Sequence, residues 1–174
     1  GVVFQNPSLD LKLTVVENLR HHGHLYGLWG RALERQIQAA LNQMELEDRA
    51  TDLVETLSGG LQRRAELAKA TLHQPKVLLL DEPGTGLDPG ARRNFMRYLA
   101  HLRETVSMTI VLTTHILDEA ESCDRVGILN EGKLVAMGTR DALKDRVGGD
   151  VVTIDSRTPV ILREQIYHLF GYES

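Results

Sequence analysis

The stretch VLLLDEPGTGLDPGARR, Val77–Arg93, decides the fold class because it joins a strand to a helix through a turn that carries carboxylates. Its first four residues are all apolar, as expected of a parallel strand that is buried on both faces. Asp88 and Pro89 are the residue types expected at the N-cap and first position of a helix. The stretch therefore predicts a strand–turn–helix unit of an α/β layer.

Strands and helices keep alternating after this unit. The further strands are predicted at Thr109–Thr114, Arg125–Asn130, Lys133–Gly138 and Val151–Asp155. The further helices are predicted around Leu117 and Ala120, at Asp141–Val147 and at Val160–Phe170. Such alternation favours an α/β fold with a mainly parallel sheet.

The region before Val77 has a different pattern and predicts an α-helical subdomain. The apolar run Val2–Gln5 is typical of the end of a buried strand. Thr14 can then cap a helix, with Glu17 completing a capping box. Apolar residues recur afterwards at helical spacing, at Leu33, Ile37, Leu41 and Met44.

These patterns divide the chain into four segments. We expect residues 1–7 to be the end of a core strand with its loop, and residues 8–75 to be the helical subdomain. Residues 76–140 are expected to form the rest of the α/β core, and residues 141–174 the start of a C-terminal extension. Both ends of the chain enter apolar elements without a lead-in, which indicates a piece of a longer protein.

Composition limits the classes of function. The chain has 20 Lys and Arg against 24 Asp and Glu, a formal net charge of -4, so no general attraction to nucleic acid is expected. Its one cysteine excludes an internal disulfide framework. No apolar run approaches the roughly 18 residues of a membrane span. We expect a soluble chain that reaches a membrane only through a partner.

Candidate chemical groups stand at the ends of predicted strands, where ligands bind in open α/β sheets. Asp81 is placed to support Mg²⁺, which prefers oxygen ligands, and Glu82 to activate a water molecule. Gln5 and His115 follow two other strands. Taken alone, the Asp-Glu pair also fits an exposed acidic turn, and a single His also fits a structural role.

The stretch Leu57–Gly60, LSGG, predicts an anion cradle at the start of a helix, where free amides face outward. A phosphate loop to accompany it is not evident in the sequence. The run Gly127–Leu134, GILNEGKL, fits G-x-x-x-x-G-K but has Leu134 in place of the hydroxyl residue that would ligate Mg²⁺. It also lies between two predicted strands, whereas a phosphate loop starts a helix.

The order of these motifs resembles the ATPase domain of ATP-binding cassette (ABC) proteins over nearly all of residues 1–140. Under the resemblance Gln5 corresponds to the Q-loop and His115 to the H-loop. The signature motif, the Walker B strand with its Glu, and the D-loop correspond to Leu57–Leu61, Val77–Glu82 and Gly86–Asp88. The family usually has Gln where Leu61 stands. The implied fold is a truncated P-loop NTPase core, whose Walker A motif would precede Gln5.

The resemblance also implies a role for each matching residue. Glu82 would activate the attacking water, His115 would contact the γ-phosphate of ATP, and Asp81 and Gln5 would support Mg²⁺. Two such domains pair head to tail in this family. The residues that would face the ATP held by the other domain are Ser58, Gly59, Gly60 and Asp88.

The function implied is that of an ABC transporter ATPase subunit, coupling ATP hydrolysis to transport. The helical subdomain is where the family docks its transmembrane permease, so the subunit is expected at the inner face of the cell membrane. The stretches TGLDP, THILDEAE and GKLVAMGT are most similar to bacterial ABC-2-type exporters.

Two alternatives remain open at this point. One is a soluble ABC ATPase acting on nucleic acid or ribosomes, although only 53 positions separate Gln5 from Ser58 and the chain has a single cysteine. The other is a non-catalytic interaction fragment, because the chain without Walker A is expected to be inactive alone. Arg63 and Arg64 are interpreted as a solvated helix face, and His21–His24 lacks the spacing of a helical metal site.

Overall fold

The computed structural model describes residues 1–147 of the 174. Its contacts divide the chain into two compact units, Gly1–Cys123 and a second unit that begins at Asp124. None of the described helices is long and apolar enough to cross a membrane. The strand expected at Val151–Asp155 and the helix expected at Val160–Phe170 lie outside the described residues.

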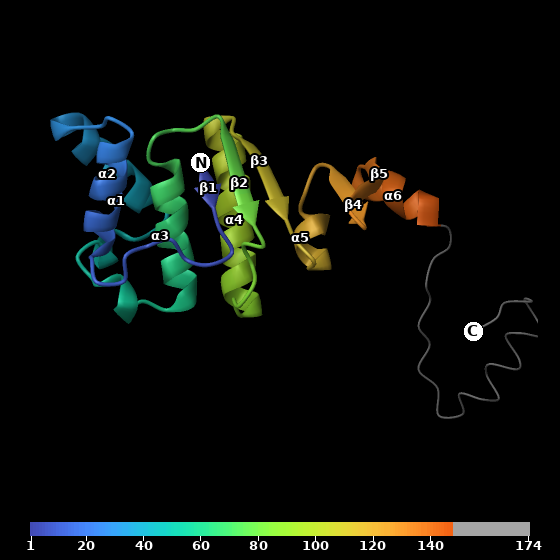
Figure 1. Cartoon of the computed structure of the whole chain (residues 1–174), viewed down its shortest axis with the longest axis horizontal. Coiled ribbons are helices and arrows are strands. Elements are labelled where there is room, and N and C mark those ends of the chain that lie inside the picture. The colour runs from blue at the N-terminus through green and yellow to red at the C-terminus, as the bar shows by residue number, and fades with distance from the viewer. Residues whose placement is uncertain (148–174) are drawn as a thin grey trace, which may run out of the picture. The chain divides into compact units, whose positions relative to one another are not determined.

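The first unit is built on a three-stranded parallel sheet in the order β1-β2-β3 (Figure 1). The strands are β1 (Val2–Val3), β2 (Val77–Asp81) and β3 (Thr109–Thr113). Parallel neighbours require crossover connections. The helical region links β1 to β2, and α4 (Pro89–Val106) links β2 to β3. The expected α/β fold with a parallel sheet is confirmed.

The helical region contains α1 (Val15–Leu25), α2 (Gly30–Gln43) and α3 (Gly59–Thr71). Two short 3-10 helices, η1 and η2, join α2 to α3 at Glu47–Arg49 and Val54–Thr56. The capping box at the start of α1 is confirmed, because Thr14 accepts from the Glu17 amide and the Glu17 carboxylate accepts from the Thr14 amide. Asp88 caps α4, as its place ahead of Pro89 predicts.

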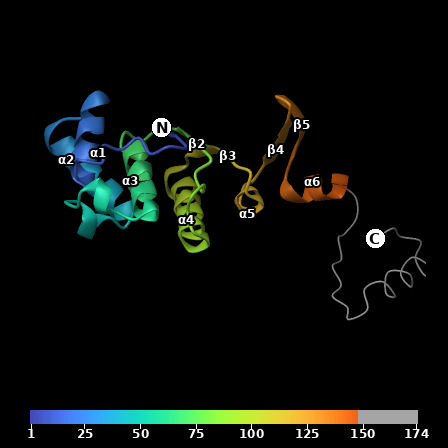
Figure 2. The same ribbon diagram turned by 60° about the horizontal axis from the view of Figure 1, so that its bottom comes forward.

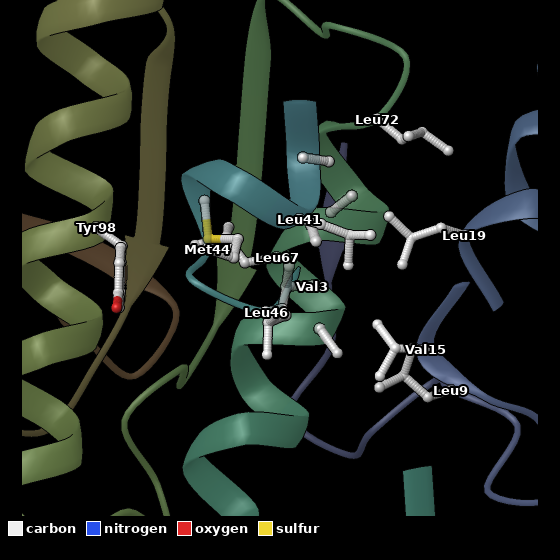
Figure 3. Close-up of a cluster of buried hydrophobic side chains, with 14 of the residues drawn as sticks. Val3, Leu9, Val15, Leu19, Leu41, Met44, Leu46, Leu67, Leu72 and Tyr98 are labelled. Atoms are coloured by element: carbon white, nitrogen blue, oxygen red, sulfur yellow. The ribbon is translucent and has the colours of Figure 1, made fainter. Parts of the chain in front are cut away.

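One hydrophobic core connects the helices to the sheet. Figure 3 shows side chains of this cluster, among them Leu19 of α1, Leu41 of α2 and Leu67 of α3. Each of these three is at most 2% exposed. The apolar stripes read from the sequence therefore face inward, and they fix α3 against the sheet through Val3, which is 1% exposed.

Only one face of the parallel sheet is covered within the first unit. Figure 2 shows α3 and α4 on the same side of β2 and β3. Val3, Leu78 and Leu80 point to this side and are buried. On the opposite face, Val2 is 45% exposed and its register partner Leu79 is 46% exposed.

Val111 of β3 continues this row beside Leu79 and is 51% exposed. The inference that the apolar run Val77–Leu80 is buried on both faces is therefore wrong for the first unit. Alternate side chains of a strand point to opposite faces, and no element of Gly1–Cys123 packs on this second face. The first unit ends with the short helix α5 (Leu117–Glu121).

The second unit begins with an antiparallel hairpin of β4 (Val126–Asn130) and β5 (Lys133–Gly138), followed by α6 (Arg140–Val147). Glu131 and Gly132 at the turn both have positive φ, 48° and 75°. Two successive positive φ values are what a two-residue hairpin turn of type I′ requires. The stretch GILNEGKL is therefore a hairpin and not a phosphate loop at a helix start.

Candidate functional site

The candidate site lies where the parallel strands of the first unit end. Gln5 follows β1, Asp81 ends β2 with Glu82 directly after it, and His115 lies two residues beyond the end of β3. Carboxyl ends of parallel strands share one edge of the sheet, the usual location for ligands in α/β folds. Residues far apart in the sequence thereby become neighbours.

Glu82 is the centre of this group. Its Oε2 accepts a hydrogen bond from Gln5 Nε2 at 2.9 Å and another from Thr85 Oγ1 at 3.1 Å. Its Oε1 lies 3.4 Å from His115 Nδ1, an ion pair whenever the imidazole is protonated. The side chain of Glu82 is 32% exposed, so water has access to a carboxylate that is held from three directions.

The backbone of Glu82 is held in an uncommon conformation. Its φ of 42° lies in the left-handed region, which residues other than Gly rarely adopt. The Glu82 amide donates to the carbonyl of Thr113 at 3.1 Å and to the Thr113 hydroxyl at 3.0 Å. Such backbone strain persists where the surrounding structure fixes it, often at functional sites.

Asp81 and Gln5 carry the oxygen atoms that fit Mg²⁺. Asp81 Oδ1 accepts a hydrogen bond from the Thr113 hydroxyl at 2.6 Å, which fixes the carboxylate at the sheet edge. Because Gln5 donates its amide nitrogen to Glu82, its amide oxygen faces away from that carboxylate. Mg²⁺ is commonly held by one or two protein oxygens together with phosphate and water. The donor set therefore fits this ion.

The second group of predicted residues lies at the starts of two helices. Ser58 caps α3 and accepts from the Leu61 amide at 3.4 Å, and an added Cβ at Gly59 would meet nothing within 4 Å. Asp88 caps α4 and accepts from the amides of Ala91 and Gly90, both at 2.9 Å. These bonds lower the pKa of Asp88 below its ordinary value, and the bond from Ala91 has the largest effect.

These two helix starts are adjacent. A Cβ added at Gly60 would lie 3.2 Å from the Cβ of Ala91 in α4. The structure thus brings Gln5, Asp81, Glu82 and His115 into one group, and the Ser58–Gly60 segment next to the first turn of α4. Within residues 1–147, no hydrogen bond joins the two groups directly.

Sequence reasoning missed Thr113 and Thr85, whose hydroxyls hold Asp81 and Glu82. Only their positions could have indicated this role, since both lie within four residues of a candidate residue along the chain. It was also wrong about Arg63, which is 6% exposed and does not belong to a solvated face. The carbonyls at the ends of β1 and β2 need donors once they are buried, and the Arg63 guanidinium supplies them.

A buried carboxylate adjoins the loop after Glu82. Glu119 of α5 is 1% exposed, and neither of its carboxylate oxygens has a hydrogen-bond partner in the described residues. A Cβ added at Gly84 would overlap this carboxylate. A side chain at this position would therefore displace the Glu119 carboxylate.

The His21–His24 segment packs with aromatic rings at the end of α1. The His22 ring lies 4.9 Å from that of Tyr26, which stacks on His73 at 3.7 Å. Burial, followed by the positive charges of Lys69, His73 and the N-terminus, lowers the pKa of His22 from 6.5 to about 4. His22 is therefore neutral in the folded protein near neutral pH.

Comparison with known proteins identifies a family. The family model described as "ABC transporter" matches residues 1–85. The linearmycin resistance ATP-binding protein LnrL of Bacillus subtilis is 39% identical over 153 residues, covering 87% of this chain and 49% of that protein. The Nod factor export ATP-binding protein I of Rhizobium johnstonii is 42% identical, covering 91% of this chain and 51% of that protein.

Solved structures agree with the sequence matches. The cbiO1 protein of Clostridium perfringens, part of the ABC transporter complex cbiONQ, superimposes with a TM-score of 0.78 at 25% identity. That match covers 98% of this chain and 64% of the other. A dimeric ATP-binding cassette, MJ0796 bound to ADP and Pi, gives a TM-score of 0.69 at 28% identity, covering 80% and 62%.

The chain spans about half the length of the curated relatives that it matches. Those matches extend over most of its own residues, and the family model covers Gln5 and Glu82 of the strand-end group. The family model, the sequence matches and the fold agree, and the chain belongs to the ABC transporter family as part of an ATP-binding domain.

Proposed function

We propose that this chain is part of the ATP-hydrolysing subunit of an ABC transporter that exports its substrate across a membrane. The observation that carries the proposal is the contact of Glu82 with both Gln5 and His115. A carboxylate that is oriented by hydrogen bonds on one oxygen and remains 32% exposed is suited to accept a proton from water. The names of the relatives, which refer to linearmycin resistance and Nod factor export, support the export direction.

In the proposed reaction Glu82 acts as the general base. Gln5 and Thr85 fix its Oε2, so that the carboxylate presents a constant direction to the attacking water. His115, 67% exposed, is free to approach the charge that develops on the γ-phosphate. Preorganised donors of this kind stabilise the transition state of phosphoryl transfer.

Asp81 and Gln5 are proposed as the protein ligands of Mg²⁺. The ion supplies neutralisation of charge on the transferred phosphoryl group when it is bound. Thr113 holds the Asp81 carboxylate from the neighbouring strand. Gln5 is thus a proposed metal ligand that also bonds the base Glu82. Its position therefore affects both the metal and the base.

We propose that Ser58, Gly59, Gly60 and Asp88 serve ATP held by a second ATPase domain in a head-to-tail dimer. The exposed amides at the start of α3 favour an anion by roughly 0.3–1 kcal/mol, which makes a clamp and not a complete binding site. For that reason the 174 residues alone are proposed not to hydrolyse ATP.

The remaining partner in the proposal is a transmembrane permease. Residues 8–75 are proposed as the helical subdomain that docks it, residues 1–7 and 76–140 as the ATPase core, and residues 141–174 as the start of a C-terminal extension. The subunit would then work at the cytoplasmic face of the cell membrane. The solved relative cbiO1, described as part of a transporter complex, supports a permease partner.

The test is an ATPase assay on the complete subunit together with its transmembrane permease. We expect phosphate release that depends on Mg²⁺ and is lost when the ion is chelated. The 174-residue chain, assayed in parallel, should release no phosphate. Turnover that persists without divalent cations would contradict the metal proposal, and a complete subunit without any turnover would contradict the function.

A further inference from the structure

Arg63 of α3 connects three backbone carbonyls around the candidate site. Its Nη1 donates to the carbonyl of Phe4 at 2.6 Å, and its Nε donates to that of Pro83 at 3.0 Å. Its Nη2 lies 3.4 Å from the carbonyl of Asp81. Phe4 directly precedes Gln5, while Asp81 and Pro83 stand on either side of Glu82. One side chain therefore holds the backbone next to both residues.

The charge of Arg63 is balanced by Glu66, one turn further along α3. Nη1 of Arg63 lies 2.6 Å from Glu66 Oε2, and the two side chains are only 6% and 0% exposed. The other oxygen of Glu66 accepts from the amide of Ser8 at 2.5 Å and from its hydroxyl at 3.2 Å. The loop that follows Gln5 is thus fixed to the same pair.

Stability alone is a weak reason for this arrangement. Removing two charges from water costs several kcal/mol per ion, and buried pairs replaced by apolar residues are often no less stable. The planar geometry of the guanidinium explains the arrangement better. A planar group with five donors can reach several carbonyls at once, whereas a lysine ammonium acts as a single point charge.

We infer that Arg63 is a positioning residue that couples the signature helix α3 to the base Glu82 and to Gln5. Ser58 and Gly59, at the start of α3, face outward, and Arg63 lies one turn further along the same helix. A displacement of α3 by an anion at its start is transmitted through Arg63 to both strand ends. The inference rests on the proposed function for its catalytic consequence, but the coupling itself is a property of the folded chain.

The experiment compares Arg63→Lys with Arg64→Lys in the complete subunit. Arg64 is the next residue of the same helix, and it bonds the carbonyl of Met44 and the hydroxyl of Tyr98, away from the strand ends. For Arg63→Lys we expect kcat to fall at least about tenfold with KM for ATP nearly unchanged, because small misplacements of catalytic groups cost rate. The Arg64→Lys control should keep kcat near that of the parent.

A second readout does not depend on turnover. Amide hydrogen exchange should become faster in Arg63→Lys at Gln5, Glu82 and Gly84, while the amides of α4 stay at the parental rate. Parental kcat or parental exchange in a folded Arg63→Lys variant would overturn the inference. If the parent itself lacks ATPase activity, the proposed function fails. The exchange result alone then tests whether Arg63 couples α3 to Glu82 and Gln5.

The double variant Arg63→Gln, Glu66→Gln covers the case in which Arg63→Lys does not fold. It removes both charges together, so that neither is left buried without a partner. We expect it to fold and to show the same loss of kcat and the same faster exchange. If both variants fail to fold while Arg64→Lys folds, the pair serves the fold alone and the inference is overturned.

Discussion

The side-chain amide of Gln5 donates to the carboxylate of Glu82 at 2.9 Å, although 77 positions separate the two residues. The contact exists because β1 and β2 are parallel neighbours that end at the same edge of the sheet. Gln5 and Thr85 both hold Oε2 of Glu82, and Oε1 is the oxygen nearest to His115. One oxygen of Glu82 is thus fixed by hydrogen bonds, and the other lies beside His115. The predictions for Glu82→Gln and His115→Ala rest on this arrangement.

Glu82→Gln in the complete subunit should lower ATP hydrolysis by at least about 100-fold, because the variant keeps size and polarity but loses the base. ATP-bound dimers should then accumulate and be visible by size-exclusion chromatography. Asp118→Asn, which changes an exposed carboxylate on α5, is the matched control. Hydrolysis at the parental rate would show that Glu82 is not the base.

His115→Ala should reduce turnover far more than it reduces affinity for ATP. The imidazole stands beside Glu82 and is placed to meet charge on the γ-phosphate, which is greatest during the reaction. Turnover is measured by phosphate release and affinity by equilibrium titration, with the exposed His101→Ala as control. Equal losses in both quantities would instead indicate a general role in binding or folding.

Gly84→Ala should destabilise the fold by about 1–3 kcal/mol, the usual cost of overpacking a filled site. The new Cβ would overlap the carboxylate of Glu119 and lie 3.1 Å from Cγ of Arg92, so the buried Glu119 side chain would have to shift. Gly59→Ala is the matched control, since its Cβ would meet nothing within 4 Å. Denaturant unfolding of both variants checks this, and equal midpoints would contradict the steric argument.

Stability should rise with pH between about 4 and 6.5 because of His22. In the unfolded chain this group takes up its proton near its ordinary pKa of 6.5, whereas burial lowers the pKa in the folded state to about 4. The unfolded state therefore binds more protons in that window, so stability is present above it and is lost as pH falls.

His22→Gln should flatten this pH dependence, as measured by denaturant unfolding across the window. Part of the slope should remain, because burial also lowers the pKa of His73. His21→Gln, at an exposed position of the same helix, is the control. A slope that is identical in His22→Gln and in the parent would contradict the assignment.

The 174-residue chain should self-associate through the open face of its sheet. Val2, Leu79 and Val111 form an exposed apolar row across the three strands, and a surface of this kind favours contact with a second copy. Light scattering at micromolar concentrations should detect dimers or larger species. Val111→Glu should reduce them, whereas Leu117→Glu, an exposed position on α5, should not. A clean monomer in the parent chain would refute the prediction.

The sequence by itself determined the elements whose causes are local. Asp88 ahead of Pro89 and the Thr14–Glu17 capping box start helices through bonds that span three residues, so a short window contains all the information needed. The order of Gln5, Leu57–Leu61, Val77–Glu82 and His115 identified the family before any contact was known. It also located the strand ends at which the candidate residues meet.

Only the tertiary structure decided which side chains are buried and what they bond. Arg63 reads as a surface residue in a helix of mixed polarity, but three carbonyls that stand 18 to 59 positions away enclose it. Thr113 likewise bonds Asp81 from the neighbouring strand. The apolar run of β2 predicted two covered faces, and packing by α3 and α4 covers one. Burial and long-range hydrogen bonds depend on which elements pack together, and a local pattern of residue types does not contain that information.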